Sequence, residues 1–164
     1  GPMPGGIKQH PFNQVDGLKK IINKNTAAVV IELIQGEAGI VPAKKVFINE
    51  IKKLCRKNNA LIVIDEVQSG VGRTGHLYAY EKYDIKPDIL CSAKGMGNGI
   101  PIGAILTTNK VAKAMQVGAH GSTYGGNPLA CSVSYEVFKE VSKKSFLNSV
   151  IKKEKLFILS LIHI

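Results

Sequence analysis

The amino-acid sequence predicts an α/β fold with a mainly parallel β-sheet flanked by helices. Short, continuous apolar runs at residues 27–31 and 61–64 are each followed by a segment in which apolar residues recur at helical spacing. Such runs are typical of strands buried on both faces, and alternation of strand and helix is typical of parallel sheets. Further runs at 88–93 and 102–106 extend the pattern. The sequence therefore predicts strands at all four runs.

The segments between these runs indicate where the helices lie. We expect Asp16 to cap a short helix whose apolar face is formed by Leu18, Ile21 and Ile22. A helix over 43–58 is expected to bury Phe47, Ile51, Leu54 and Cys55. Shorter helices are expected at 77–83 and 110–116. A longer helix should begin at Pro128 with Asn127 as its cap, and bury Ala130, Val133, Val137, Phe138 and Val141.

Length and composition are those of a globular domain. The chain has 164 residues, of which 45% are hydrophobic and 21% charged, which argues against disorder. No apolar stretch approaches the ~20 residues that span a bilayer, so we expect no membrane association. The cysteines Cys55, Cys91 and Cys131 are odd in number and widely spaced. We therefore expect neither a disulfide framework nor a metal site, and a cytoplasmic location.

The net charge of +10 raises the question of nucleic-acid binding. All basic residues except Arg56 and Arg73 are lysines, and many occur as pairs along amphipathic segments, such as Lys52–Lys53 and Lys152–Lys153. Nucleic-acid binders use arginine for bidentate contacts and cluster their charge. Solvated helix faces are therefore the favoured interpretation, and a basic nucleic-acid-binding module is the alternative.

Polar residues close three of the predicted strands. Glu32, Asp65 and Lys94 each follow an apolar run, about 30 residues apart, the length of a βαβ unit. The carboxyl ends of parallel strands lie at one sheet edge, where ligands of open α/β sheets bind. An ion pair capping the sheet would also explain these residues. Because glycine loops flank all three, we favour a binding site.

A lysine and an acid at one sheet edge have a specific chemical use. A desolvated lysine amine forms a Schiff base with a carbonyl, and a nearby acid can hold a proton on a pyridine nitrogen. Pyridoxal 5'-phosphate needs this pair of groups. The loop Gly121-Ser122-Thr123 offers backbone N–H groups and hydroxyls for a phosphate.

Four stretches of the sequence resemble the class III (ω-amino) aminotransferases of fold type I, most closely the acetylornithine and ornithine aminotransferases. They are residues 31–39 (IELIQGEAG), 64–75 (IDEVQSGVGRTG), 87–89 with 93–95 and 101–104 (PDI, AKG, PIGA), and 120–129 (HGSTYGGNPL). The order and spacing of these stretches also match the family, over roughly residues 5–145. One visible departure is Leu33, which stands where the family often has proline.

The resemblance implies a role for each matching residue. Lys94 would attach pyridoxal phosphate and shuttle the proton, and Asp65 would pair with the ring nitrogen. Val67 would pack on one ring face and Gln68 would hydrogen-bond the phenolic oxygen. The remaining assignments are Glu37 as the switch residue that pairs with a substrate-binding arginine, Glu32 as a supporting residue, Arg73 as a structural residue, and Ser122 and Thr123 as phosphate ligands for the neighbouring subunit.

The implied reaction moves the terminal amino group of acetylornithine or ornithine to 2-oxoglutarate, in a homodimer with a shared active site. Alternatives are another ω-amino-acid aminotransferase, such as 4-aminobutyrate aminotransferase, or a catalytically incompetent fragment. The early Gly-Thr phosphate loop, the aromatic residue of the second ring face and the carboxylate-binding arginine have no counterpart in the sequence.

The resemblance also implies that the chain is only part of a longer enzyme. We expect residues 1–145 to be a partial cofactor-binding large domain and 146–158 to start the connection to a C-terminal domain. Residues 159–164 are expected to be a non-native tail, because they match a translation of CTG TCT CTT ATA CAC ATC, which resembles a transposase end; an ordinary apolar tail is the alternative.

Overall fold

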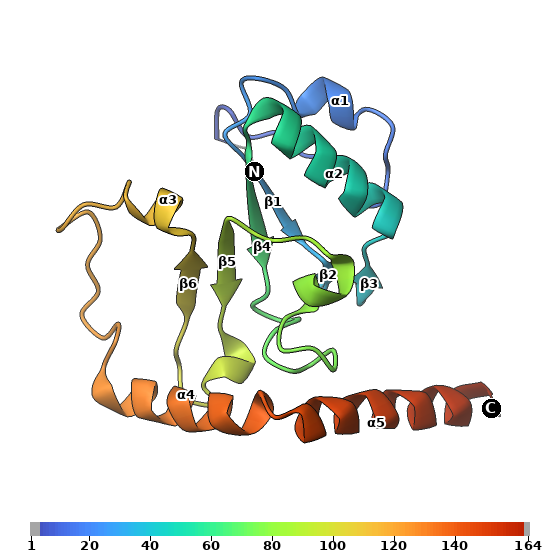
Figure 1. Cartoon of the computed structure of the whole chain (residues 1–164), viewed down its shortest axis with the longest axis vertical. Helices are drawn as coiled ribbons and strands as arrows, with labels where there is room; N and C mark the ends of the chain where they lie inside the picture. Colours follow the sequence, from blue (N-terminus) through green and yellow to red (C-terminus); the bar gives the residue numbers. More distant parts are fainter. Residues whose placement is uncertain (1–3, 163–164) are drawn as a thin grey trace.

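The computed structural model describes residues 4–162 and contains a four-stranded sheet in the order β1-β4-β5-β6, with a separate two-stranded ribbon (Figure 1). The strands are β1 (Ala28–Glu32), β2 (Ile34–Gln35), β3 (Val41–Pro42), β4 (Leu61–Asp65), β5 (Ile89–Ser92) and β6 (Ala104–Thr107). The helices are α1 (Leu18–Ile21), α2 (Lys45–Asn58), α3 (Asn109–Ala112), α4 (Pro128–Val141) and α5 (Lys144–Ile162), with the 3-10 helices η1 (Ala79–Tyr83) and η2 (Lys94–Met96).

The register of the sheet confirms the mainly parallel α/β fold. β1 pairs with β4 in parallel, which places Glu32 opposite Asp65, and β4 pairs with β5 in parallel, which places Asp65 opposite Cys91. Within the four-stranded sheet of residues 4–162, β6 alone is antiparallel, with Ala104 opposite Ser92. The carboxyl ends of β1, β4 and β5 therefore lie at the same edge of the sheet.

The main core lies between α2 and the sheet. The predicted inward face of α2, formed by Phe47, Ile51, Leu54 and Cys55, is buried as expected. It belongs to one apolar cluster with Ile31, Ile62 and Ile64 from the strands and with Leu18 and Ile22 near α1. At about 1.5–3 kcal/mol for each large side chain, this burial is the main stabilising contribution to the fold.

The prediction that the apolar runs are buried on both faces is wrong for the outer strands. Val30 in β1 is 72% exposed and Ile105 in β6 is 73% exposed. β1 and β6 end the four-stranded sheet, and within residues 4–162 β1 is covered by the α1–α2 cluster on one face only. An apolar run alone does not reveal whether both faces are covered in this part of the chain.

The predicted starts of two short helices also need correction. Asp16 does not cap α1; the N-cap is Gly17, whose φ of 90° is left-handed, and no side chain caps the helix. The segment expected as a helix over 110–116 is helical only in α3, where the hydroxyl of Thr108 accepts from the N–H of Val111. The segment expected at 77–83 is present as η1.

The two C-terminal helices run along the carboxyl edge of the parallel strands (Figure 1). The predicted cap is confirmed, because Asn127 Oδ1 accepts from the N–H of Ala130 at 2.9 Å. Of the predicted inward face of α4, only Ala130 is buried; Val133, Val137, Phe138 and Val141 are half-buried. Phe138 and Val141 pack on a second apolar cluster, centred on Val71, Tyr78 and Leu90.

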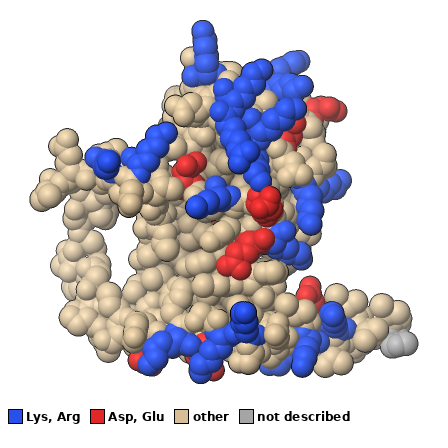
Figure 2. Space-filling model, viewed as in Figure 1, with Lys and Arg blue, Asp and Glu red and all other residues tan. Residues whose placement is uncertain are grey.

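Lysine and arginine side chains gather over α2 and form a second row along α4 and α5 (Figure 2). Several pair with acids, including Lys52 with Asp84 at 3.1 Å and Lys139 with Glu136 at 2.9 Å. Exposed pairs of this kind contribute about 0–1 kcal/mol each. None of the helices in the described part of the chain is long and apolar enough to cross a membrane.

Candidate active site

The sheet brings three predicted site residues to one edge. Glu32 and Asp65 are the last residues of β1 and β4 and lie opposite each other in register. Lys94 begins η2, two residues beyond the end of β5, which neighbours β4. The expectation that these residues share the carboxyl edge of the sheet is therefore met by the geometry.

Lys94 is held by Gln68 from the turn that follows β4. Its Nζ donates to Gln68 Oε1 at 2.6 Å. The Lys94 backbone has φ 43°, in the left-handed region that a side chain with a Cβ rarely adopts. Strained residues of this kind cluster at functional sites. The expected desolvation of the amine is not met within this chain, because the Lys94 side chain is exposed.

The end of β4 and the turn after it carry four of the predicted residues, Asp65, Val67, Gln68 and Arg73. Asp65 Oδ1 accepts from the N–H of Val67 at 2.9 Å, which fixes the carboxylate at the strand end. Arg73 Nε donates to the carbonyl of Gln68 at 2.7 Å. Hydrogen bonds therefore fix both the Asp65 carboxylate and the backbone that carries the Gln68 amide.

Glu66 is a residue whose importance the sequence analysis missed. It is fully buried, and its carboxylate accepts three hydrogen bonds: from Ser69 Oγ at 2.6 Å, from the N–H of Ala79 at 3.0 Å and from the N–H of Tyr80 at 2.8 Å. The two backbone donors belong to the first turn of η1, so Glu66 ties the site turn to this 3-10 helix. Burial raises the pKa of the Glu66 carboxyl, and the three hydrogen bonds oppose the rise.

The backbone on both sides of Glu66 is also tied down. Its N–H donates to the carbonyl of Cys91 at 2.9 Å, and its carbonyl accepts from the N–H of Gly70 at the same distance. A Cβ at Gly70 would meet that carbonyl at 2.7 Å, so only glycine allows the turn to close this tightly. One signal of this anchor was present in the sequence, because a second acid directly follows the strand-ending Asp65.

Cys91 lies opposite Asp65 in the neighbouring strand β5. Burial raises the pKa of the Cys91 thiol, and the adjacent charge of Asp65 raises it further. Cys91 is consequently a poor nucleophile next to the site, since the thiolate is the reactive form.

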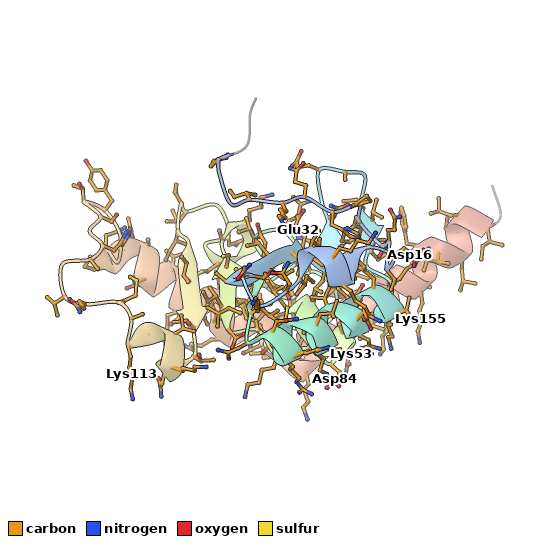
Figure 3. The ribbon with its side chains drawn as sticks, turned by 90° about the horizontal axis from the view of Figure 1, so that it is seen from above. Asp16, Glu32, Lys53, Asp84, Lys113 and Lys155 are labelled. Carbon is orange, nitrogen blue, oxygen red and sulfur yellow. The ribbon has the colours of Figure 1, made fainter. Side chains whose placement is uncertain are left out.

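The loop after β1 contributes Glu32, Gly36 and Glu37. Glu32 Oε1 accepts from the N–H of Gly36 at 3.4 Å, a long hydrogen bond. Glu37 is exposed beside it. Figure 3 shows Glu32 on the opposite side of the molecule from Lys53 of α2, Asp84 and Lys113, so the strongly basic outer face of α2 is not part of this site.

The predicted phosphate ligands Ser122 and Thr123 lie away from the end of β5. Both are exposed, and they belong to the segment that passes beyond β6 between α3 and α4 (Figure 1). Ser122 Oγ accepts from the N–H of Gly125 at 2.9 Å, a local turn. The structure does not bring them to Lys94, an arrangement compatible with the expectation that they serve a neighbouring subunit.

The donor set at the sheet edge fits pyridoxal phosphate. An amine, a carboxylate and a neutral amide converge there, and these are the groups suited to an aldehyde, a ring nitrogen and a phenolic oxygen. Lys94, Asp65 and Gln68 would hold the ring.

Comparison with known proteins gives the same family throughout. A family model described as aminotransferase class-III matches residues 5–164. The acetylornithine/succinyldiaminopimelate aminotransferase of Buchnera aphidicola is 54% identical over 155 residues, which is 94% of this chain and 38% of the relative. The chain thus spans well under half the length of this relative.

Solved structures support the fold as well as the family. The N-acetylornithine aminotransferase of Stenotrophomonas maltophilia superimposes with a TM-score of 0.82 and 37% identity, over 94% of this chain and 40% of that one. An ornithine aminotransferase from Toxoplasma gondii, described with partial occupancy of PLP at its active site, gives a TM-score of 0.79 and 37% identity, over 95% and 35%.

Proposed function

The chain belongs to the class-III aminotransferases, and we propose that it is part of an enzyme that moves the terminal amino group of acetylornithine or ornithine to 2-oxoglutarate. The observation that carries the proposal is the contact of Lys94 with Gln68 at the carboxyl edge of the sheet, beside Asp65. The names of the relatives, acetylornithine/succinyldiaminopimelate and N-acetylornithine aminotransferase, support the substrate class.

Each site residue has a defined task in this proposal. Pyridoxal phosphate supplies an electron sink that stabilises negative charge at the carbon next to the reacting nitrogen. Lys94 Nζ would hold the cofactor and would move a proton as a free amine. Asp65 would hold a proton on the ring nitrogen, Gln68 would hydrogen-bond the phenolic oxygen, and Val67 would pack on the ring.

The remaining predicted residues concern the substrate and the partner subunit. Glu37 is proposed to pair with a substrate-binding arginine, and Glu32 to support the loop through the N–H of Gly36. Ser122 and Thr123 are proposed to bind the cofactor phosphate of a second copy, so that two subunits share each site. We also propose a cytoplasmic location, in keeping with the three free cysteines.

The cofactor proposal is tested by titrating the chain with pyridoxal phosphate and reducing with borohydride. A reduced adduct that disappears in Lys94→Ala is expected. If the wild-type chain forms none, the alternative of a catalytically incompetent fragment is favoured instead.

The substrate proposal is tested in the longer polypeptide that we propose contains this chain. Single-turnover amino transfer should be fastest with N-acetylornithine or ornithine. Faster transfer from N-succinyldiaminopimelate or 4-aminobutyrate would refute that choice while leaving the reaction type intact.

The domain limits are proposals of the same kind. We propose residues 1–145 as part of the cofactor domain, 146–158 as the start of a connection, and 159–164 as a non-native tail; residues 163–164 lie outside the described part of the chain. The described residues of both segments form one helix, α5. The coding DNA tests the tail, since any other synonymous spelling than CTG TCT CTT ATA CAC ATC defeats the transposase-end hypothesis.

A further inference from the structure

The backbone of Gly36 lies directly against the side chain of Gln68. A Cβ placed on Gly36 would stand 2.5 Å from Gln68 Cδ and 2.8 Å from Oε1, far inside ordinary van der Waals contact. Gly36 is buried, and its φ lies outside the left-handed region. The backbone conformation thus accepts other residues, and the space taken by Gln68 is what excludes a side chain here.

Both backbone polar groups of Gly36, its N–H and its carbonyl, are hydrogen-bonded. Its N–H donates to Glu32 Oε1 at 3.4 Å, and its carbonyl accepts from the N–H groups of Gly39 and Ile40 at 3.2 and 3.3 Å. The loop after β1 is therefore tied to the end of that strand and folded back on itself. A loop fixed in this way restricts the side chain that packs against it, which here is that of Gln68.

Gln68 is restricted on its other side by the turn after β4. The Gln68 carbonyl accepts a hydrogen bond from Arg73 Nε, which fixes the backbone of Gln68. The side-chain amide of Gln68 lies against the backbone of Gly36, and its Oε1 accepts from Lys94 Nζ. A flexible side chain with a fixed backbone and one blocked side has few remaining rotamers. Those that remain include the one that directs Oε1 to the Lys94 amine.

We propose that Gly36 is a positioning residue that keeps the Gln68 amide on Lys94, an inference that rests on the proposed role of Lys94. Gln68 ends in a flexible group that can swing away from a new methyl group. Gly36→Ala should therefore leave the fold intact and break the contact between Gln68 and Lys94. If Gly36 were needed only for folding, Gly36→Ala would destabilise the fold and leave the contact between Gln68 and Lys94 in place.

The first measurement uses the full 164-residue chain without cofactor. Trace acetylation with acetic anhydride, read by mass spectrometry and normalised to the other lysines, reports how available the Lys94 amine is. Loss of the hydrogen bond should raise the Lys94 rate on the order of fivefold. Gln68→Ala should give the same rise, and the double variant no more than either single one.

Gly5→Ala is the matched control, because nothing lies within 4 Å of a Cβ at Gly5 and its φ is not left-handed. It should leave both the Lys94 rate and the thermal midpoint unchanged. Gly36→Ala should also keep the wild-type midpoint. A wild-type Lys94 rate in Gly36→Ala overturns the proposal, as does a lowered midpoint, or a wild-type rate in Gln68→Ala.

A second measurement separates this inference from the proposed function. Borohydride trapping of pyridoxal phosphate on Lys94 is compared in the wild-type chain and Gly36→Ala. Trapping in the wild type that falls in the variant supports both. A changed acetylation rate without any trapping in the wild type supports Gly36 as a positioning residue and favours a catalytically incompetent fragment. Equal trapping with equal acetylation refutes the positioning role alone.

Discussion

Replacing Glu66 with alanine tests whether one buried carboxylate holds the site turn to η1. The change removes the acceptor for Ser69 Oγ and for the N–H groups of Ala79 and Tyr80. The serine hydroxyl can rotate to another partner, but the two backbone donors cannot. Glu66 is fully buried, so water does not readily replace the carboxylate.

The expected loss follows from these contacts. Two backbone hydrogen bonds contribute about 1–1.5 kcal/mol each, and the lost buried methylene about 0.8 kcal/mol. Relief of the buried charge offsets part of this sum. The net expectation is roughly 3 kcal/mol lower unfolding free energy, which corresponds to a fall of roughly 6–12 °C in Tm for a chain of this size.

Urea denaturation followed by far-UV circular dichroism measures this loss directly. Glu66→Gln should fall between wild type and Glu66→Ala, because its carbonyl can still accept from Ser69 and Ala79 while its NH2 group faces the Tyr80 donor. Glu136→Ala is the control, since Glu136 is an exposed α4 residue paired with Lys139. It should change stability by no more than about 0.5 kcal/mol. A Glu66→Ala loss inside that same range would show that the Glu66 carboxylate does not hold the site turn to η1.

Three further predictions concern single groups. Lys94→Gly should be about 1 kcal/mol more stable to urea than Lys94→Ala, because φ 43° strains any residue with a Cβ; an equal or higher stability of the alanine variant would contradict this. In mapped iodoacetamide labelling, Cys131 should react before Cys91 and Cys55 last, since Cys131 is exposed whereas Cys55 is buried with its pKa raised to about 11; early labelling of Cys55 would contradict the core packing. Because folding raises the pKa of Glu66 above its ordinary 4.5, the folded chain binds the Glu66 proton more tightly than the unfolded chain does. The stability contributed by this proton is full below pH 4.5 and is lost as the pH rises through the folded-state pKa. Urea melts should show this pH dependence in the wild type and not in Glu66→Gln.

The sequence predicted the site edge because polar residues ended apolar runs. Glu32 and Asp65 lie in register as the two parallel strands require, and Lys94 follows the next strand in the sheet. Strand ends are local features, so spacing and composition suffice to find them. The contact between Lys94 and Gln68 needed the turn geometry, which depends on buried hydrogen bonds.

The missed features depend on packing that the residue types do not encode. The sequence shows two consecutive acids, Asp65 and Glu66, but residue type does not tell which of them is buried against η1. Val30 was expected to be buried because its run is apolar, yet it lies on a sheet face that residues 4–162 leave uncovered. Asp16 fits a cap by type, but the left-handed Gly17 takes the cap position.

Locating the adduct tests whether Lys94 is the attachment point for pyridoxal phosphate. The chain is mixed with pyridoxal phosphate, reduced with borohydride, digested and mapped by mass spectrometry. We expect the pyridoxyl group on the peptide that contains Lys94, and we expect it to be lost in Lys94→Ala. A label spread over the exposed lysines of α2, α4 and α5, with no preference for Lys94, would contradict it.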